Sequence, residues 1–263
     1  AGITQCINLK SLNALNNSEI TNVNHLAKLE ILDASFICGI NDAGITQCIN
    51  LKSLNALGNN KITNVNHLVK LEILNASQSG INNAGIVHCI NLKSLNASKN
   101  KKITNVNHLT KLEKLDISSN CGINNAGIVN CINLKSLNAR NNFYIKTVNH
   151  LTKLEFLNAS GYCGINDAGI MNCINLRSLN VSCNIGITNV NNLVNLEILD
   201  ATLNSDYDNC GINDAGIVQC INLKSLDASY NPKITNVNHL AKLEILDAIG
   251  YNCGINDAGI VQC

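Results

Sequence analysis

A repeated frame of two leucines, a small residue and an asparagine runs through this chain of 263 residues. Its first copy is LKSLNALNN, from Leu9 to Asn17. Eleven further copies begin at Leu29, Leu51, Leu71, Leu92, Leu112, Leu134, Leu154, Leu176, Leu196, Leu223 and Leu243. Most neighbouring copies start 20 to 22 residues apart, and a fixed period in this range indicates a solenoid of stacked coils.

Two kinds of coil alternate, so the true period is a pair of about 42 residues. Short coils carry Thr-Asn-Val-Asn-His-Leu after the frame, and long coils carry Gly-Ile-Asn-Asp-Ala-Gly-Ile or a close variant. The residue after the first leucine is Lys or Arg in short coils and Glu in long coils, as at Lys10 and Glu30. Stacking would place these charges in an alternating ladder, which disfavours a slip of one coil.

The frame L-x-x-L-x-A-x-x-N resembles the leucine-rich repeat, with alanine at the third apolar site. The short coils resemble internalin-type repeats, and the long coils, with Cys38 before Gly-Ile-Asn-Asp, look like the cysteine-containing class. The resemblance implies an α/β solenoid with a parallel sheet on the concave face and turns, 3₁₀ turns and short helices on the convex face. It implies roles in host-cell attachment, effector action or substrate recruitment for ubiquitination. Residues 1–263 would form a single domain cut in mid-repeat at both ends, because Ala1 starts in the phase of Ala43.

Within each coil, period-2 alternation predicts which strand residues point inward. In the first coil Leu12 and Ala14 would face the core, while Ser11, Asn13 and Leu15 face the concave side. An asparagine closes the strand in every short coil, and its amide could satisfy turning backbone groups of adjacent coils. This ladder comprises Asn17, Asn59, Asn100, Asn142, Asn184 and Asn231. In long coils we expect the cysteine before Gly-Ile to take over part of this role.

Composition limits the classes of partner. The formal charge of +1 leaves no basic footprint for nucleic acid or an anionic membrane. No window approaches the ~18 apolar residues of a membrane span. No C-x-x-C motif occurs, and the spaced histidines, such as His25 and His67, are read as a solvated convex face, so no metal or cofactor is expected. The insertion Asp206-Tyr207-Asp208-Asn209 is read as a solvated bulge in preference to a calcium loop.

Most of the thirteen cysteines fall into two columns of the repeat. One column exchanges Cys48 for Leu26 or Leu68 of the short coils, which predicts a buried core site. Cysteines in one column would lie roughly 10 Å apart, beyond the ~7 Å that a disulfide spans. Only Cys183 lies outside both columns, and a disulfide with a neighbouring coil is possible there. The unpaired thiols favour a cytoplasmic location, including a host-cell cytosol.

Two sets of residues stand out as a candidate binding surface. The outward position before the second strand leucine is Ser in short coils, whereas long coils carry Ile31, Ile73, Lys114, Phe156, Ile198 and Ile245. A polar column borders them and includes Asp33, Asp116, Asp200 and Asp247. Exposed apolar residues bordered by polar ones suggest a contact surface. The alternative is that duplication copied these isoleucines without a ligand.

The second set is aromatic. Seven of the eight aromatic residues follow the strands, where the coils vary most: Phe36, Phe143, Tyr144, Tyr162, Tyr207, Tyr230 and Tyr251. Tyr and Phe are common interface anchors, so this rim is a candidate binding edge. Drift in unconstrained loops explains the variation equally well, but explains the aromatic residues less well.

The sequence therefore predicts a non-catalytic protein–protein interaction module. No nucleophile, base and orienting group stand out from the repeat, so no catalytic residue is assigned. The alternative is a structural scaffold that self-associates end to end, since no polar capping coil is visible.

Overall fold

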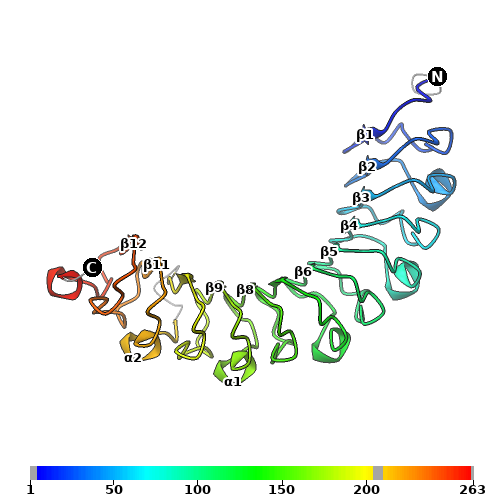
Figure 1. Cartoon of the computed structure of the whole chain (residues 1–263). Coiled ribbons are helices and arrows are strands. Elements are labelled where there is room, and N and C mark those ends of the chain that lie inside the picture. Colours follow the sequence, from blue (N-terminus) through cyan, green and yellow to red (C-terminus); the bar gives the residue numbers. More distant parts are fainter. Residues whose placement is uncertain (1–4, 204–209, 262–263) are drawn as a thin grey trace. The chain divides into compact units, whose positions relative to one another are not determined.

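The computed structural model describes residues 5–203 and 210–261, and its strands follow the copies of the frame one by one (Figure 1). The coils form two compact units, Ala1–Asn133 and Leu134–Cys263. The first unit contains β1 (Ser11–Asn13), β2 (Ile31–Asp33), β3 (Ser53–Asn55), β4 (Ile73–Asn75), β5 (Ser94–Asn96) and β6 (Lys114–Asp116). The second contains β7 (Ser136–Asn138), β8 (Phe156–Asn158), β9 (Ser178–Asn180), β10 (Ile198–Asp200), β11 (Ser225–Asp227) and β12 (Ile245–Asp247). The predicted parallel solenoid is thus confirmed.

Within each unit the strands pair in parallel and in register. Leu12 lies beside Leu32 in the first unit, and Leu137 beside Leu157 in the second. Each strand has three residues because its last residue turns the chain away: in β2 the Asp33 carboxylate accepts a hydrogen bond from the Ser35 amide at 3.0 Å. The sheet therefore consists of short strands that expose two side chains each, and we call this surface the sheet face.

The core lies between the sheet and the opposite side of each coil. The inward leucines Leu29 and Leu32 and the small Ala34 are at most 1% exposed, and the same positions are buried in the interior coils. Burying a leucine side chain stabilises a fold by about 1.5–3 kcal/mol. The stacked leucines are therefore the main source of stability, and the alternation that the sequence predicted is confirmed.

The predicted asparagine ladder is present and buried in the interior coils. The Asn100 amide donates to the carbonyls of Ala76 at 2.8 Å and Ile81 at 3.0 Å, both in the preceding coil. Its oxygen accepts from the amide of Lys102 at 2.9 Å. The same oxygen accepts from the Ile103 amide at 3.3 Å, so one side chain satisfies four backbone groups at a buried turn. In long coils Cys210 and Cys253 donate to the equivalent carbonyls of Val181 and Ala228, as the sequence predicted.

A single helical turn marks each long coil opposite the sheet. These turns are η1 (Asp42–Ile45), η2 (Asn83–Ile86), η3 (Asn125–Gly127), α1 (Asp167–Ile170), α2 (Asp214–Ile217) and η4 (Asp257–Ile260). The motif Asn41-Asp42 suggests a cap for a helix of one to two turns that ends near Cys48. Asn41 does cap η1, by accepting from the Gly44 amide at 3.0 Å, but the helix ends at Ile45. None of the helices in the described ranges has the length and apolarity of a membrane span.

Asp42 has a different task from capping its own helix. Its carboxylate accepts from the Thr63 amide at 2.7 Å and the Thr63 hydroxyl at 2.6 Å, in the following short coil. Asp167 and Asp214 make the same contacts with Thr188 and Thr235. These carboxylates therefore join the long coils to the short coils that follow them.

The histidine column also joins coils, which corrects the prediction of a solvated surface. His67, His108 and His239 are half-buried, and each places Nε2 within 3.0–3.1 Å of a helix carbonyl in the preceding long coil. The acceptors are Ile45, Ile86 and Ile217. Each of these carbonyls also accepts from the backbone amide of the cysteine three residues later, as Ile45 does from Cys48 at 2.9 Å. The imidazole is thus a second partner, supplied by the next coil.

Candidate partner-binding surfaces

The apolar residues predicted on the sheet face are exposed to solvent. Ile31 and Ile73 are each 51% exposed in the first unit, and Phe156, Ile198 and Ile245 are similarly exposed in the second. Ile31 lies between Ser11 and Ser53 on the neighbouring strands, and Ile73, Phe156 and Ile198 also lie between two serines. Ile245, on the last strand, lies beside Ser225. The apolar side chains thus recur at every second strand, roughly 10 Å apart, and Lys114 takes the third position in the first unit.

The polar column beside them has a structural role that the sequence reading missed. Asp33, Asp116 and Asp200 each accept a hydrogen bond from the amide two residues later, which ends the strand. Burial raises the pKa of Asp200, and the nearby Asp227 adds to this effect. Asp33 also accepts from the Asn55 amide at 2.9 Å, so the column is partly occupied by its own chain. Asp247 ends β12 at the same column position.

The aromatic residues lie in the loops that follow the strands, which we call the rim. All that fall within the described residues are exposed, from Tyr230 at 39% to Tyr251 at 86%: Phe36, Phe143, Tyr144, Tyr162, Tyr230 and Tyr251. Tyr207 lies outside the described residues. Phe143 and Tyr144 pack edge to face with ring centroids 6.4 Å apart, and the Lys146 ammonium lies 3.5 Å from the Phe143 centroid.

Two rim aromatics occupy a backbone position that favours asparagine or glycine. Phe36 has φ +57° and Tyr230 has φ +60°. The same place in other coils is held in the same left-handed region by Asn16, Gly58, Gln78, Lys99, Ser119, Asn141, Gly161, Cys183 and Gly250. The sequence shows this column only through its glycines, two residues after the small inward residue. A bulky side chain at such a φ costs roughly 1–2 kcal/mol relative to glycine.

Each of these two aromatics faces a glycine in the next coil. A methyl group added to Gly58 would lie 3.1 Å from Cδ1 of Phe36, and one added to Gly250 would collide with the Tyr230 ring. Both glycines also have positive φ, at +68° and +106°. The ring and the glycine therefore form a matched pair, in which the absent side chain of the glycine leaves room for the ring.

A hollow of about 230 Å³ opens on the rim of the second unit. It is lined by Arg140, Asn141, Ser160, Gly161, Tyr162, Ser182 and Cys183. The half-buried Cys183 thiol lies 4.0 Å from the Thr202 carbonyl. The pKa of the neighbouring Cys210 is raised mainly by burial, and the nearby Cys183 raises it further. No disulfide forms among the described cysteines, so the bond proposed for Cys183 is absent here.

Five repeat cysteines occupy equivalent buried positions in the core. Burial raises the pKa of Cys48, Cys89, Cys131, Cys173 and Cys220 to about 11. Each of these thiols donates to a valine carbonyl of the preceding coil. Within residues 5–203 and 210–261, no group of three or more His, Cys, Asp or Glu could hold a metal ion.

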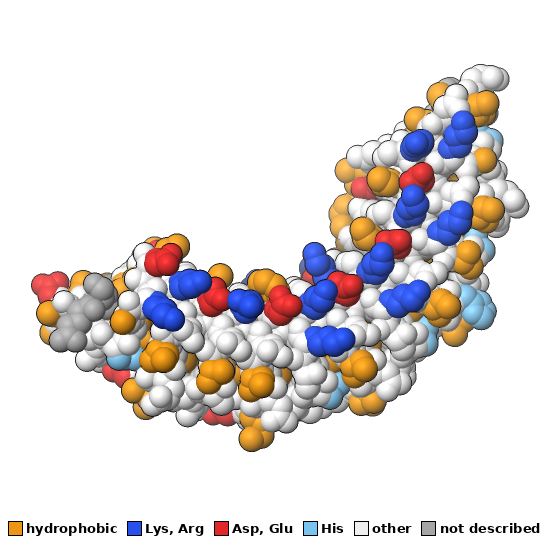
Figure 2. Space-filling model, viewed as in Figure 1, with side chains coloured by type: hydrophobic (Ala, Val, Ile, Leu, Met, Phe, Trp, Pro, Cys, Tyr) orange, Lys and Arg blue, Asp and Glu red, His pale blue; other side chains and the backbone are white. Residues whose placement is uncertain are grey.

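A third surface, which the sequence reading missed in part, lies where the chain enters the strands. We call it the lateral face. The predicted charge ladder is formed there: Lys52 meets Glu30 at 2.8 Å, Lys93 meets Glu72 at 2.8 Å, and Glu197 meets both Arg177 and Lys224. Figure 2 shows these alternating charges along the side of each unit. Such exposed pairs fix register more than they add stability.

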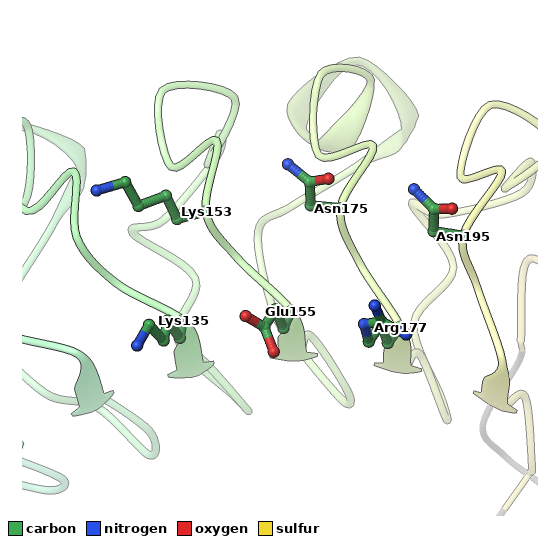
Figure 3. Close-up of a pocket in the computed structure, with 6 residues that line it drawn as sticks. All are labelled: Lys135, Lys153, Glu155, Asn175, Arg177 and Asn195. Atoms are coloured by element: carbon green, nitrogen blue, oxygen red, sulfur yellow. The ribbon is translucent and has the colours of Figure 1, made fainter.

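A second row of polar side chains lies next to the ladder. In short coils it holds lysine, and in long coils asparagine, with Lys70 donating to Asn50 at 2.7 Å and Lys242 to Asn222 at 2.6 Å. In the second unit a hollow of about 310 Å³ separates the two rows. Figure 3 shows Lys135, Glu155 and Arg177 at the strand starts, with Lys153, Asn175 and Asn195 in the second row.

An exposed aliphatic column directly precedes the second row in the sequence. In the first unit it contains Ile7, Ile49, Val69, Ile90 and Ile132, and in the second Ile174, Val194 and Ile221. Their exposed fractions range from 51% to 60%. The remaining members are small or polar, such as Thr110 and Thr152. The signal was present in the motif Cys-Ile-Asn-Leu of every long coil, but the period alone does not tell which apolar letters face solvent.

Comparison with solved structures decides the fold class. An internalin, InlF, from Listeria monocytogenes superposes with a TM-score of 0.66 at 21% identity, covering 93% of this chain and 75% of that chain. The chain has an internalin-like leucine-rich repeat fold. No protein-family profile matches the sequence, and no curated protein matches it.

Two further structures share this internalin-like fold. The functional domain of InlJ from Listeria monocytogenes, which includes a cysteine ladder, gives a TM-score of 0.51 at 20% identity over 91% of this chain and 67% of that one. A leucine-rich repeat protein of Leptospira interrogans gives 0.54 at 18% identity, over 94% and 80%. At these identities the likeness concerns the fold alone.

Proposed function

We propose that this internalin-like protein is a non-catalytic binding module that holds a protein partner against its sheet face and rim. The observation that carries the proposal is the pair of aromatic residues in left-handed positions. Phe36 and Tyr230 occupy a column where asparagine or glycine would cost less free energy. Backbone strain of this kind concentrates at functional sites, because selection keeps the strained residue for its contacts.

The sheet face supplies a complementary set of anchors. Ile31 and Ile73 in the first unit, and Phe156 and Ile198 in the second, project between serines that leave them accessible. A partner that covers them would remove apolar surface from water at several points along each unit. The varied rim then provides selectivity, because it differs from coil to coil whereas the sheet face repeats.

Two multiple variants test this function, and the chain itself offers the replacement residues. In the sheet variant Ile31, Ile73, Phe156, Ile198 and Ile245 become Ser, the residue of the alternate strands. In the rim variant Phe36 and Tyr230 become Asn, as at Asn16 and Asn141 of the same column. Proteins captured by the parent from a candidate lysate, identified by mass spectrometry, are then measured for affinity with each variant.

We expect the sheet variant to lose the captured partner and the rim variant to bind it at least about tenfold more weakly, the effect typical of one interface anchor. We also expect the rim variant to unfold at a higher temperature, because asparagine tolerates the left-handed region better. A partner held with unchanged affinity by both variants would contradict the proposed surfaces.

A further inference from the structure

The lateral face carries a feature that protein binding on the sheet face leaves unused. Its aliphatic column lies beside the lysines of the second row, so that each unit presents an apolar stripe with positive charges along one edge (Figure 2). We propose that this stripe binds the surface of an anionic lipid bilayer. The assignment uses a different face from the proposed protein site and is independent of it.

The stripe extends over three successive coils in each unit, with Ile174, Val194 and Ile221 in the second. Ile49, Val69 and Ile90 occupy equivalent places in three successive coils, and each is more than half exposed. Coils are spaced by one strand, roughly 4.8 Å, so these three neighbouring side chains form an aliphatic line, which Thr110 ends in the first unit. Single exposed aliphatic residues are ordinary, but a line of them along a solenoid is a contact surface.

The charges next to the line select the partner. On the lateral face of the first unit, six lysines from the ladder and second row accompany three glutamates, an excess of three positive charges. In the second unit five basic residues accompany three glutamates, an excess of two. This leaves 8 basic and 12 acidic residues for the rest of the chain. A second copy of this face would be repelled, whereas an anionic surface would be attracted.

The ammonium groups are held in place. Lys28, Lys70 and Lys111 each donate to an asparagine of the preceding long coil at 2.6–2.7 Å. The bond leaves their charge intact and keeps them beside the aliphatic line. Apolar residues that enter the acyl boundary while lysines stay at the headgroups are the arrangement of interfacial membrane binders.

The regular repetition of the lateral face favours a bilayer over a protein as its binding partner. The rim changes from coil to coil. The lateral face repeats Ile-Asn in five of the six long coils and, in most short coils, a small or aliphatic residue followed by Lys. A protein surface would have to repeat its own chemistry at the same spacing to use this stripe. A lipid surface presents the same headgroups everywhere, so it can contact every copy of the repeated residues without having a matching spacing of its own.

Vesicle co-sedimentation tests the proposal with the full chain. The probes are vesicles of phosphatidylcholine alone and vesicles with an equal amount of phosphatidylserine, at low and at physiological salt. In the apolar variant Ile49, Ile90, Ile174 and Ile221 become Thr, the residue at Thr110 and Thr152 of the same column. In the charge variant Lys28, Lys70, Lys111, Lys153 and Lys242 become Asn, as at Asn195.

We expect the parent to bind the phosphatidylserine vesicles and to be released by salt, with little binding to phosphatidylcholine. Partitioning should fall by about fourfold for each isoleucine that enters the bilayer, the effect of about one methylene group. It should fall by up to about fivefold for each lysine. The sheet variant should bind vesicles as the parent does. Thermal unfolding of each variant checks that it is folded.

Three results would overturn the proposal. They are no binding of the parent to phosphatidylserine vesicles, binding that both lateral variants retain, and a dimer in sedimentation velocity that the apolar variant abolishes. The last would assign the stripe to a second copy. An acidic protein captured from lysate by the parent and lost by the apolar variant, without vesicle binding, would assign it to a protein.

Discussion

The ring of Tyr230 occupies the space into which a side chain at Gly250, its equivalent in the next coil, would project. Gly250 has φ +106°, and a methyl group there would collide with Cδ1, Cε1 and Cγ of the ring. The aromatic residue and the glycine therefore depend on one another, and a change at either should be felt at both.

We predict that Gly250→Ala lowers the free energy of unfolding by about 1–3 kcal/mol, because alanine is strained at this φ and displaces the ring. Chemical denaturation measures the effect. Gly58→Ala should cost less, since its methyl group would lie 3.1 Å from Phe36 and its φ of +68° is closer to what other residues adopt. Adding Tyr230→Asn to Gly250→Ala should recover part of the loss, and strictly additive effects would refute the coupling.

A second prediction concerns the buried asparagine ladder. Asn100→Ala removes two donated bonds, to Ala76 and Ile81, and leaves the Lys102 amide without its acceptor. Unsatisfied buried groups cost about 1–3 kcal/mol each, so we expect a loss of about 2–4 kcal/mol in urea unfolding. Asn17, in the same column, is exposed in the first coil, and Asn17→Ala is the matched control. Equal losses at the two sites would argue against the ladder.

The cysteine column makes stability depend on alkaline pH. Burial holds the pKa of Cys48, Cys89, Cys131, Cys173 and Cys220 at about 11, above the ordinary 9.0. Between pH 9 and 11 these thiols ionise in the unfolded chain but stay protonated in the folded one. Their contribution to the free energy of unfolding is therefore complete below pH 9 and is lost as the pH rises toward 11. Melting temperatures across this range should decline.

Alanine in place of these five cysteines provides the control for that decline. The variant should be less stable at neutral pH, because each substitution leaves a cavity, but its melting temperature should change less between pH 9 and 11. A decline as steep as that of the parent would show that other groups cause it.

The carboxylate that joins long coils to short coils gives a further prediction. Asp214 accepts from the Thr235 amide at 2.7 Å and hydroxyl at 2.6 Å. Asp214→Ala should lower the free energy of unfolding by about 1 kcal/mol, the effect of losing such local bonds at a turn. Asp214→Asn should be tolerated, because Asn83 accepts from the Thr104 amide in the same way. If Asn is as harmful as Ala, the charge of Asp214 matters more than its geometry.

The repeat predicted the fold because its signals are local and periodic. The second leucine of each frame, such as Leu32, and the small Ala34 occupy alternate positions, so the pattern determined which side chains enter the core. The ladder of Asn100 followed from amide chemistry at a strand end. The fold of such a sequence can be predicted because its period, its alternation and its turn residues all indicate the same structure.

Other features depend on three-dimensional geometry that cannot be seen in the amino-acid sequence. The left-handed φ of Phe36 and Tyr230 is visible only when the coils are aligned on their glycines. The bond from His67 to the Ile45 carbonyl requires knowing where a one-turn helix ends in the neighbouring coil. Ile49 follows a buried cysteine, and a period of about 21 residues cannot tell whether the next apolar residue points in or out.

The two kinds of coil also restrict how such a protein can change length. His67 needs a helix end before it, and Asp42 needs Thr63 after it, so each kind of coil fits only the other. Loss of a single coil would bring like charges of the ladder together and leave one joint without its partner residue. Gain or loss by recombination is therefore tolerated only in pairs of coils, and the reach of this protein should evolve in steps of roughly 10 Å.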